Sequence, residues 1–188
     1  MNSVPNVEPS GNGGFIDPLK IAAVFGISEG MRVADFGSGS GYFTIILGKM
    51  VGQTGIVTAI DIMTAALDTL RGKAKAEGLT NIETVRANLE ILGSSGLSND
   101  SQDFVLLANI LFQNEKKEDI LREAKRILKL GGIMVVIAWK PDDKSFGPPK
   151  ELRTDQEAMR SIVTSVDFQF AGNIDAGSFH YGMIFKKT

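Results

Sequence analysis

The chain of 188 residues contains no cysteine and only one histidine. Without thiols it can form neither disulfides nor thiolate metal sites, and it has no cysteine nucleophile. One histidine among scattered carboxylates gives no recognisable ligand set, so we expect no metal site. Any catalytic chemistry has to use oxygen or nitrogen, and the lack of cysteine is compatible with a reducing compartment.

The chain also lacks an excess of positive charge and a long apolar run. Its formal net charge is −2, so no positive field gathers a phosphate backbone and nucleic acid is not an expected partner. The longest apolar run, 133–139, is far shorter than the roughly 20 residues that cross a bilayer, so no membrane span is expected.

The first 14 residues are polar and rich in Pro, Gly, Asn and Ser. They have neither the basic start nor the apolar stretch of a secretory signal. We therefore expect residues 1–14 to be a flexible segment, residues 15–188 to form a single domain, and the protein to be cytoplasmic.

Short apolar runs rich in β-branched residues alternate with segments of helical period. Strands are predicted at 31–36, 56–61, 82–86, 104–108, 133–139, 168–171 and 179–185, and helices at 42–50, 64–77, 115–130 and, from a capping box of Thr154 and Glu157, to about 165. The turn at 173–177 predicts an antiparallel hairpin. This order predicts an α/β fold, a Rossmann-like doubly wound sheet that is mostly parallel with an antiparallel last strand.

Three glycines at alternate positions, Gly37, Gly39 and Gly41, join the first predicted strand to the first helix. Such glycines allow positive φ angles and let a ligand lie against bare backbone at a helix N-terminus, although a merely tight turn would also use them. A dinucleotide fingerprint G-x-G-x-x-G needs a further glycine where the chain has Tyr42 or Thr44. This mismatch disfavours a nucleotide-dependent oxidoreductase, which would bind NAD.

Asp61 ends the second predicted strand, about 20 residues beyond Gly41. A carboxylate at this place can accept hydrogen bonds from both ribose hydroxyls of an adenosine ligand. An aspartate at a strand end can equally be a turn residue or a helix cap. Its combination with the glycine loop favours the ligand-binding role.

With Asp35 ahead of its glycines, the chain resembles the class I S-adenosylmethionine-dependent methyltransferases, whose first motif is acidic-x-G-x-G-x-G. Leu128, Gly131 and Gly132 resemble a late structural motif of that family. The resemblance, over roughly residues 15–188, implies S-adenosylmethionine as cofactor. The residues that it assigns to cofactor binding are Asp35, Gly37, Ser38, Gly39, Gly41, Asp61, Ile62, Asn88, Leu89 and Asn109.

The resemblance assigns these residues to different parts of the cofactor. In the family, the positions of Ile62, Asn88 and Leu89 contact the adenine, and that of Asn109 meets the methionine end. Asn88 stands where the family commonly has aspartate. Its amide can still donate and accept, but a solvated turn residue would fit as well.

The resemblance implies in-line methyl transfer to a small-molecule acceptor. A sulfonium carries its own leaving group, so transfer needs an aligned nucleophile and exclusion of water more than a reactive side chain. His180 is the candidate base, with simple packing as the alternative. Gln113 stands where many relatives have histidine and cannot act as a base. The Asn-Pro-Pro-aromatic motif of amino-group methylases is absent after Ala108, which favours small molecules.

A non-catalytic S-adenosylmethionine-binding or regulatory protein would keep the glycine loop and Asp61 but lack an acceptor pocket; turnover of the cofactor separates the two. We expect residues 139–149, with Phe15 and Ile16, to form the acceptor side, because the loop after strand five opens on the cofactor's sheet edge. Gly147, Pro148 and Pro149 match a Gly-Pro-Pro of relatives. An ordinary surface loop is the alternative.

Overall fold

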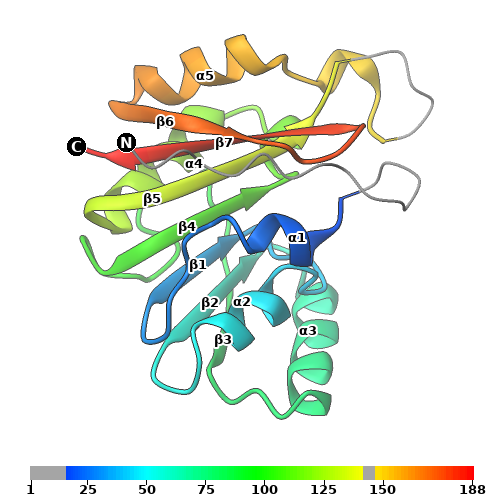
Figure 1. Cartoon of the computed structure of the whole chain (residues 1–188), viewed down its shortest axis with the longest axis vertical. Helices are drawn as coiled ribbons and strands as arrows, with labels where there is room; N and C mark the ends of the chain where they lie inside the picture. Colours follow the sequence, from blue (N-terminus) through cyan, green and yellow to red (C-terminus); the bar gives the residue numbers. More distant parts are fainter. Residues whose placement is uncertain (1–15, 142–146) are drawn as a thin grey trace.

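The computed structural model describes residues 16–141 and 147–188. Within them, one sheet has the strand order β3-β2-β1-β4-β5-β7-β6, with helices on both faces (Figure 1). The strands are β1 (Arg32–Phe36), β2 (Ile56–Asp61), β3 (Ile82–Arg86), β4 (Gln102–Ala108), β5 (Leu128–Trp139), β6 (Phe168–Ile174) and β7 (His180–Lys187). The helices are α1 (Pro18–Ala22), α2 (Thr44–Met50), α3 (Thr64–Ala76), α4 (Lys117–Ile127) and α5 (Gln156–Ser165), with 3-10 turns η1 (Leu111–Gln113) and η2 (Lys150–Leu152). The predicted flexible segment 1–14 and Phe15 lie outside the described residues.

Strands β1 to β5 are parallel, and β7 runs antiparallel to both β5 and β6. This confirms the predicted doubly wound sheet with an antiparallel last strand. The strand order reverses between β1 and β4, because the chain builds outward from β1 in one direction and from β4 in the other. Open α/β sheets place ligand crevices at such a point, outside the carboxyl ends of the strands.

The fifth strand begins earlier than the sequence predicted, and the helix before it ends earlier. Leu128 has extended backbone angles, φ −68° and ψ 139°, and pairs with Gln102 of β4. Gly131, with φ +79°, lies within β5 and does not close a helix. The predicted helix at 115–130 is therefore three residues too long at its C-terminal end. The apolar spacing continues to 130, but Leu128 pairs with β4 and the chain is already extended there.

Two helix starts also differ from expectation. The cap of α5 is Asp155, whose Oδ1 accepts a hydrogen bond from the Ala158 N–H at 2.8 Å, so the capping box at Thr154 is wrong by one residue. Helix α1 was not predicted at all. Asp17 caps it by accepting from the N–H groups of its second and third residues, and Pro18 occupies its first position.

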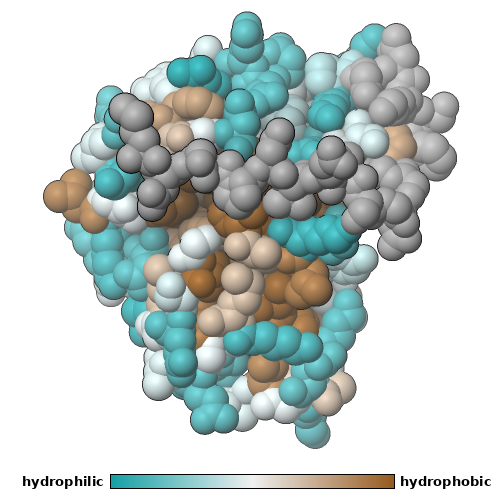
Figure 2. Space-filling view, viewed as in Figure 1, coloured by the Kyte–Doolittle hydropathy of each residue, from teal (hydrophilic) through white to brown (hydrophobic). Residues whose placement is uncertain are grey.

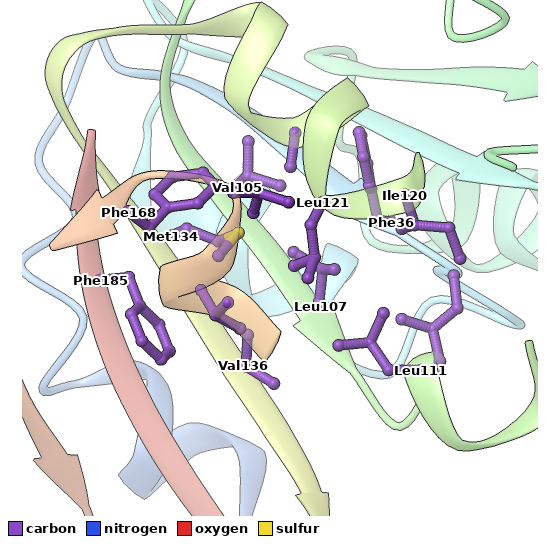
Figure 3. Packing of buried hydrophobic residues seen from close by; sticks show 14 of the residues in the cluster. Phe36, Val105, Leu107, Leu111, Ile120, Leu121, Met134, Val136, Phe168 and Phe185 are labelled. Carbon is purple, nitrogen blue, oxygen red and sulfur yellow. The ribbon is translucent and has the colours of Figure 1, made fainter. Parts of the chain in front are cut away.

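Alternation along the strands divides the core between the two faces of the sheet. Val33 of β1 joins the cluster under α1 and α2, whereas Ala34 and Phe36 join the cluster under α4 and α5. Figure 3 shows the second cluster, in which Ile120 and Leu121 of α4 pack against the sheet. On the first face, hydrophobic residues gather at the centre and hydrophilic ones surround them (Figure 2). The sheet is thus a rigid support for the loops at its edge.

Candidate cofactor and acceptor site

The three glycines of the loop after β1 all have positive φ, +70° at Gly37, +53° at Gly39 and +85° at Gly41. A Cβ at Gly37 would lie 2.8 Å from the Ile110 side chain, and one at Gly41 would collide with Leu70. A Cβ at Gly39 would meet nothing within 4 Å. The protein's own packing therefore requires two of the glycines, and Gly39 leaves open backbone beside the cleft.

Asp61 links the glycine loop to the end of β2. Its Oδ2 accepts a hydrogen bond from the Gly39 N–H, and its Oδ1 accepts one from the Met63 N–H, both at 2.8 Å. The bond to Met63 gives Asp61 the local turn role that the sequence left open. The bond to Gly39 also ties the end of β2 to the glycine loop. Ile62 and Met63 beside it are 56% and 62% exposed, so the carboxylate borders an accessible apolar surface.

Asp35 lies at the carboxyl end of β1 and is only 2% exposed. Its Oδ2 accepts a hydrogen bond of 2.6 Å from the Thr44 hydroxyl in the first turn of α2. Burial raises the pKa of Asp35 to about 6; the bond from Thr44 opposes this rise and the charge of Asp61 adds to it. Among the described residues, no cationic side chain stabilises the negative charge of Asp35. Thr44 was not predicted, because its partner is nine residues away along the chain.

Asn109 and His180 meet although 71 residues separate them in sequence. Asn109 follows β4 with a positive φ of +56°, and His180 opens β7 opposite Trp139, the last residue of β5. The Asn109 Nδ2 lies 3.2 Å from the His180 Nε2, and the ring centroids of His180 and Trp139 are 3.9 Å apart. Burial, with the nearby charges of Lys140 and Arg153, lowers the pKa of His180 to about 4.

Some of these groups line a cavity of about 450 Å³ at the carboxyl edge of the sheet, and Gly39, Gly41 and Asp61 are not among its walls. Its walls are formed by Ile16, Asp35, Gly37, Ser38, Tyr42, Phe43, Ala108, Asn109, Trp139 and His180. In the described part of the chain, three buried side-chain polar atoms have no hydrogen-bond partner: Ser38 Oγ, Asn109 Oδ1 and His180 Nδ1. All three belong to the walls of this cavity. Since buried polar groups are normally paired, their arrangement fits a polar ligand.

The expected acceptor side is partly present in this cavity. Ile16 and Trp139 both contribute to its walls, whereas Phe15 and residues 142–146 lie outside the described residues. Gly147 packs against the Trp139 ring so closely that a Cβ there would lie 2.7 Å from ring carbons. The described start of the Gly-Pro-Pro segment therefore supports the tryptophan wall.

Other predicted residues lie away from the cavity. Asn88 is exposed in a turn, where its Oδ1 accepts from the Glu90 N–H at 3.0 Å, and Leu89 is buried in the core. Gln113 is exposed on η1 and is not part of the cavity wall. No group of His, Cys, Asp and Glu in the described ranges could hold a metal ion.

Comparison with known proteins identifies the family. Residues 27–186 match the family model described as a methyltransferase domain. The chain belongs to this methyltransferase family. The assignment agrees with the resemblance found from Asp35 and the glycine loop, and it implies S-adenosylmethionine as the cofactor. None of the helices in the described residues is long and apolar enough to cross a membrane.

Two curated relatives illustrate the range of acceptors. The chain is 33% identical over 163 residues to the ubiquinone/menaquinone biosynthesis C-methyltransferase of Erwinia tasmaniensis, covering 83% of this chain and 59% of that protein. It is 30% identical over 132 residues to the arsenite methyltransferase of Homo sapiens, covering 67% of this chain and 34% of that protein. The chain thus spans between about a third and three-fifths of these relatives.

Solved structures support the same fold. A SAM-dependent methyltransferase from Aquifex aeolicus superposes with a TM-score of 0.85 at 27% identity, covering 93% of this chain and 91% of that one. The [4+2]-cyclase SpnF superposes with a TM-score of 0.77 at 14% identity and so shows likeness of fold alone. Its different chemistry means that the reaction has to be argued from the site.

Proposed function

We propose that this chain binds S-adenosylmethionine at the carboxyl edge of its sheet and transfers the methyl group to a small organic molecule. The observation that carries the proposal is the cavity beside the glycine loop, whose mainly apolar walls contain three buried polar atoms without hydrogen-bond partners. A non-catalytic S-adenosylmethionine-binding protein needs the loop and Asp61 but no acceptor side such as the one formed by Ile16 and Trp139. The cytoplasmic location stays a prediction from composition.

The walls of the cleft fit the chemistry of the cofactor. On the β2 side, Asp61 would accept the ribose hydroxyls beside the exposed Ile62, and the open backbone at Gly39 would let the ligand approach. On the β1 and β4 side, Asp35 and the Asn109 Oδ1 would accept from the ammonium group, and Ser38 Oγ would donate to the carboxylate. Asn88 and Leu89 remain proposed adenine contacts.

The protein's part in transfer is binding, alignment and exclusion of water. When bound, S-adenosylmethionine supplies an electrophilic methyl group together with its leaving group. Phe43, Ala108 and Trp139 give the cavity apolar walls, which would hold an acceptor in a fixed direction. His180, with its pKa near 4, is a weak base at neutral pH, so the acceptor atom is proposed to react without a strong protein base.

The apolar walls favour an organic acceptor over arsenite, although a relative is named for each type of acceptor. Trivalent arsenic is a soft centre that prefers thiolate ligands, and this chain contains no cysteine. An apolar ring or chain of a small organic molecule instead matches Ile16, Phe43 and Trp139. The compound methylated is thus proposed to be carbon-rich.

Calorimetry with S-adenosylmethionine and S-adenosylhomocysteine tests cofactor binding. Asp61→Ala should weaken binding by about 1–3 kcal/mol, the scale of a lost charged hydrogen bond. Asp68→Ala is the matched control, since Asp68 is an exposed carboxylate on α3 paired with Arg71. Equal affinities of the Asp61 variant and the parent chain would contradict the assignment.

A screen of small organic acceptors that follows release of S-adenosylhomocysteine tests catalysis. Release with an apolar organic acceptor is the expected result. Tight cofactor binding without release from any acceptor would favour the non-catalytic alternative. Turnover with arsenite alone would contradict the assignment of the acceptor.

A further inference from the structure

The contact between Asn109 and His180 restricts where the imidazole proton lies. The Asn109 Nδ2 faces the His180 Nε2 at 3.2 Å. An amide nitrogen donates and cannot accept, so the Nε2 of His180 must be the acceptor. A neutral imidazole carries one proton, which then resides on Nδ1, the buried atom without a partner.

The reverse amide orientation would place Asn109 Oδ1 against a protonated Nε2 and would leave the buried NH₂ group without a partner. The orientation found instead leaves the carbonyl oxygen and the Nδ1–H unpaired. A carbonyl oxygen at this place can accept from a cationic ligand, whereas an NH₂ group cannot. Under the proposed function, the ammonium group of the cofactor donates a hydrogen bond to the Asn109 Oδ1 and so fixes the orientation of the amide.

The charged groups around His180 keep the ring neutral. Lys140 of the segment after β5 and Arg153 after η2 both oppose a positive charge on it. Asp35 lies on the same cavity wall, but the ring's own hydrogen bond is to an amide and not to a carboxylate. The Trp139 ring lies against the imidazole at a tilt of 43°, with the ring centroids 3.9 Å apart, and covers one side of it. The imidazole is thus a fixed neutral dipole.

We propose that His180 serves the second substrate as a neutral hydrogen-bond donor through Nδ1–H, and that Asn109 fixes this tautomer. The acceptor molecule then presents an oxygen lone pair to His180 while its apolar body lies along Trp139 and Ile16. A carbonyl, phenol or carboxylate oxygen meets this requirement. The substrate assignment rests on the proposed function; the tautomer does not.

The donor faces the acceptor substrate because of its place in the sheet. Asp61 ends β2 and His180 opens β7, four strands away in the order β2-β1-β4-β5-β7, or about 19 Å at the usual strand spacing. Asp35 at the end of β1 and Asn109 directly after β4 lie between them and, under the proposed function, would meet the methionine end of the cofactor. His180, in contact with the Trp139 ring, lies beyond them on the acceptor side.

The single histidine makes the tautomer directly measurable. In the full chain labelled with ¹⁵N-histidine, long-range ¹H–¹⁵N correlations at pH 7 should show a protonated Nδ1 and an unprotonated Nε2. The ring should not titrate between pH 5.5 and 8. A proton on Nε2, or a charged ring at pH 7, would overturn the proposal.

Asn109→Asp tests whether the amide sets the tautomer. Aspartate tolerates the positive φ of this position almost as well as asparagine, but its carboxylate can only accept. The proton should therefore move to Nε2, and the pKa of His180 should rise. Asn99→Asp is the control, because Asn99 accepts from Arg126 on the surface and aspartate can do the same. Unchanged ring signals in the Asn109 variant would show that another group fixes the tautomer.

Two probes in the protein saturated with S-adenosylhomocysteine test the substrate. Acetophenone carries a carbonyl oxygen, and α-methylstyrene has nearly the same shape without it. Only acetophenone should move the Nδ1–H resonance downfield; equal shifts, or none, would overturn the substrate assignment. A downfield shift with S-adenosylhomocysteine alone would assign the donor to the cofactor carboxylate and also overturn it. Failure of S-adenosylhomocysteine to bind in calorimetry would refute the proposed function and leave the tautomer standing.

Discussion

Asp35 and Glu123 are the two buried carboxylates of the described residues, and their surroundings are opposite. Asp35, at the glycine loop, has one hydroxyl partner and a pKa raised to about 6. Glu123, on α4, is 0% exposed, yet its pKa falls to about 2. Burial alone would raise that pKa as well, but hydrogen bonds from Arg126, Ser95 and the Gly93 N–H outweigh it.

The two carboxylates differ in their partners, and this difference indicates a structural role for Glu123 and a ligand-binding role for Asp35. Glu123 has its own cation: Arg126 donates to both carboxylate oxygens, at 2.8 and 2.9 Å, and the carboxylate also holds the loop at Gly93 and Ser95 against α4. Asp35 lacks a cation among the described residues, and it lies where the cofactor is proposed to bind. A buried charge without an opposite charge beside it is destabilising on its own, so we attribute the position of Asp35 to a cationic ligand.

Glu123→Ala should have the largest effect on stability. It leaves Arg126 and three loop donors, the Gly93 N–H and the Ser95 N–H and hydroxyl, without their acceptor, so the free energy of unfolding should fall by about 3 kcal/mol in urea titrations at pH 7. Asp119→Ala is the matched control on the same helix, since its exposed pair with Arg122 should contribute less than about 0.5 kcal/mol. Similar losses in the two variants would remove the contrast.

The contribution of Glu123 should also depend on pH. Its pKa is lower in the folded chain than the ordinary value of 4.5, so folding favours the ionised form. The stabilisation is complete above about pH 4.5 and is lost as the pH falls towards 2. The difference in unfolding free energy between Glu123→Ala and the parent chain should shrink over this range.

Asp35→Asn should act in the opposite direction. The folded chain holds Asp35 at a raised pKa, so above pH 6 its ionised carboxylate destabilises the fold, and below about pH 3.8 it does not. The variant should therefore be more stable than the parent by about 2–3 kcal/mol at pH 8, with the gain vanishing near pH 4. The same variant should bind S-adenosylmethionine at least tenfold more weakly. Loss of stability at pH 8 would contradict this account.

Gly39→Ala should have the smallest effect on the fold. Its Cβ would enter open space, so only the strain of a positive φ, about 1 kcal/mol, should appear in thermal unfolding. Binding of S-adenosylmethionine should nevertheless weaken, because the methyl group would occupy the ligand's side of the loop. Gly41→Ala is the contrast, since it collides with Leu70 and should destabilise the chain more. A larger stability loss at Gly39 would mean that the loop has another purpose.

Much of the fold was predictable from the sequence, because it depends on local periodicity. The bounds of β2 and β3 agree with the structure, since a turn residue, Gly55 or Asn81, comes directly before each strand. Leu128 to Leu130 continue a helical spacing and yet belong to β5, where Leu128 pairs with Gln102 of β4, and no local pattern reveals this. Helix α1 was too short to show periodicity, although Asp17 and Pro18 are a start signal.

The residues of the site were predictable only where they lie together in one sequence motif. Asp35 and the glycines are contiguous, so their resemblance to a family was visible. The contacts of Asn109 with His180 and of Asp35 with Thr44 arise from strand order and helix placement. The unpaired atom of Ser38 likewise follows from burial, which no spacing reports.

If Asp35 pairs with the positive charge of S-adenosylmethionine, binding of this ligand releases protons from the protein. Titration calorimetry in two buffers of different ionisation enthalpy measures the number of protons released and is the most direct test. Binding of a cation lowers the pKa of Asp35, so at pH 6 binding should release about half a proton, and at pH 8 almost none. Affinity should fall as the pH drops from 7 to 5, and Asp35→Asn should abolish both effects. Binding that releases no proton at pH 6, with equal affinity at pH 5 and 7, would contradict the account.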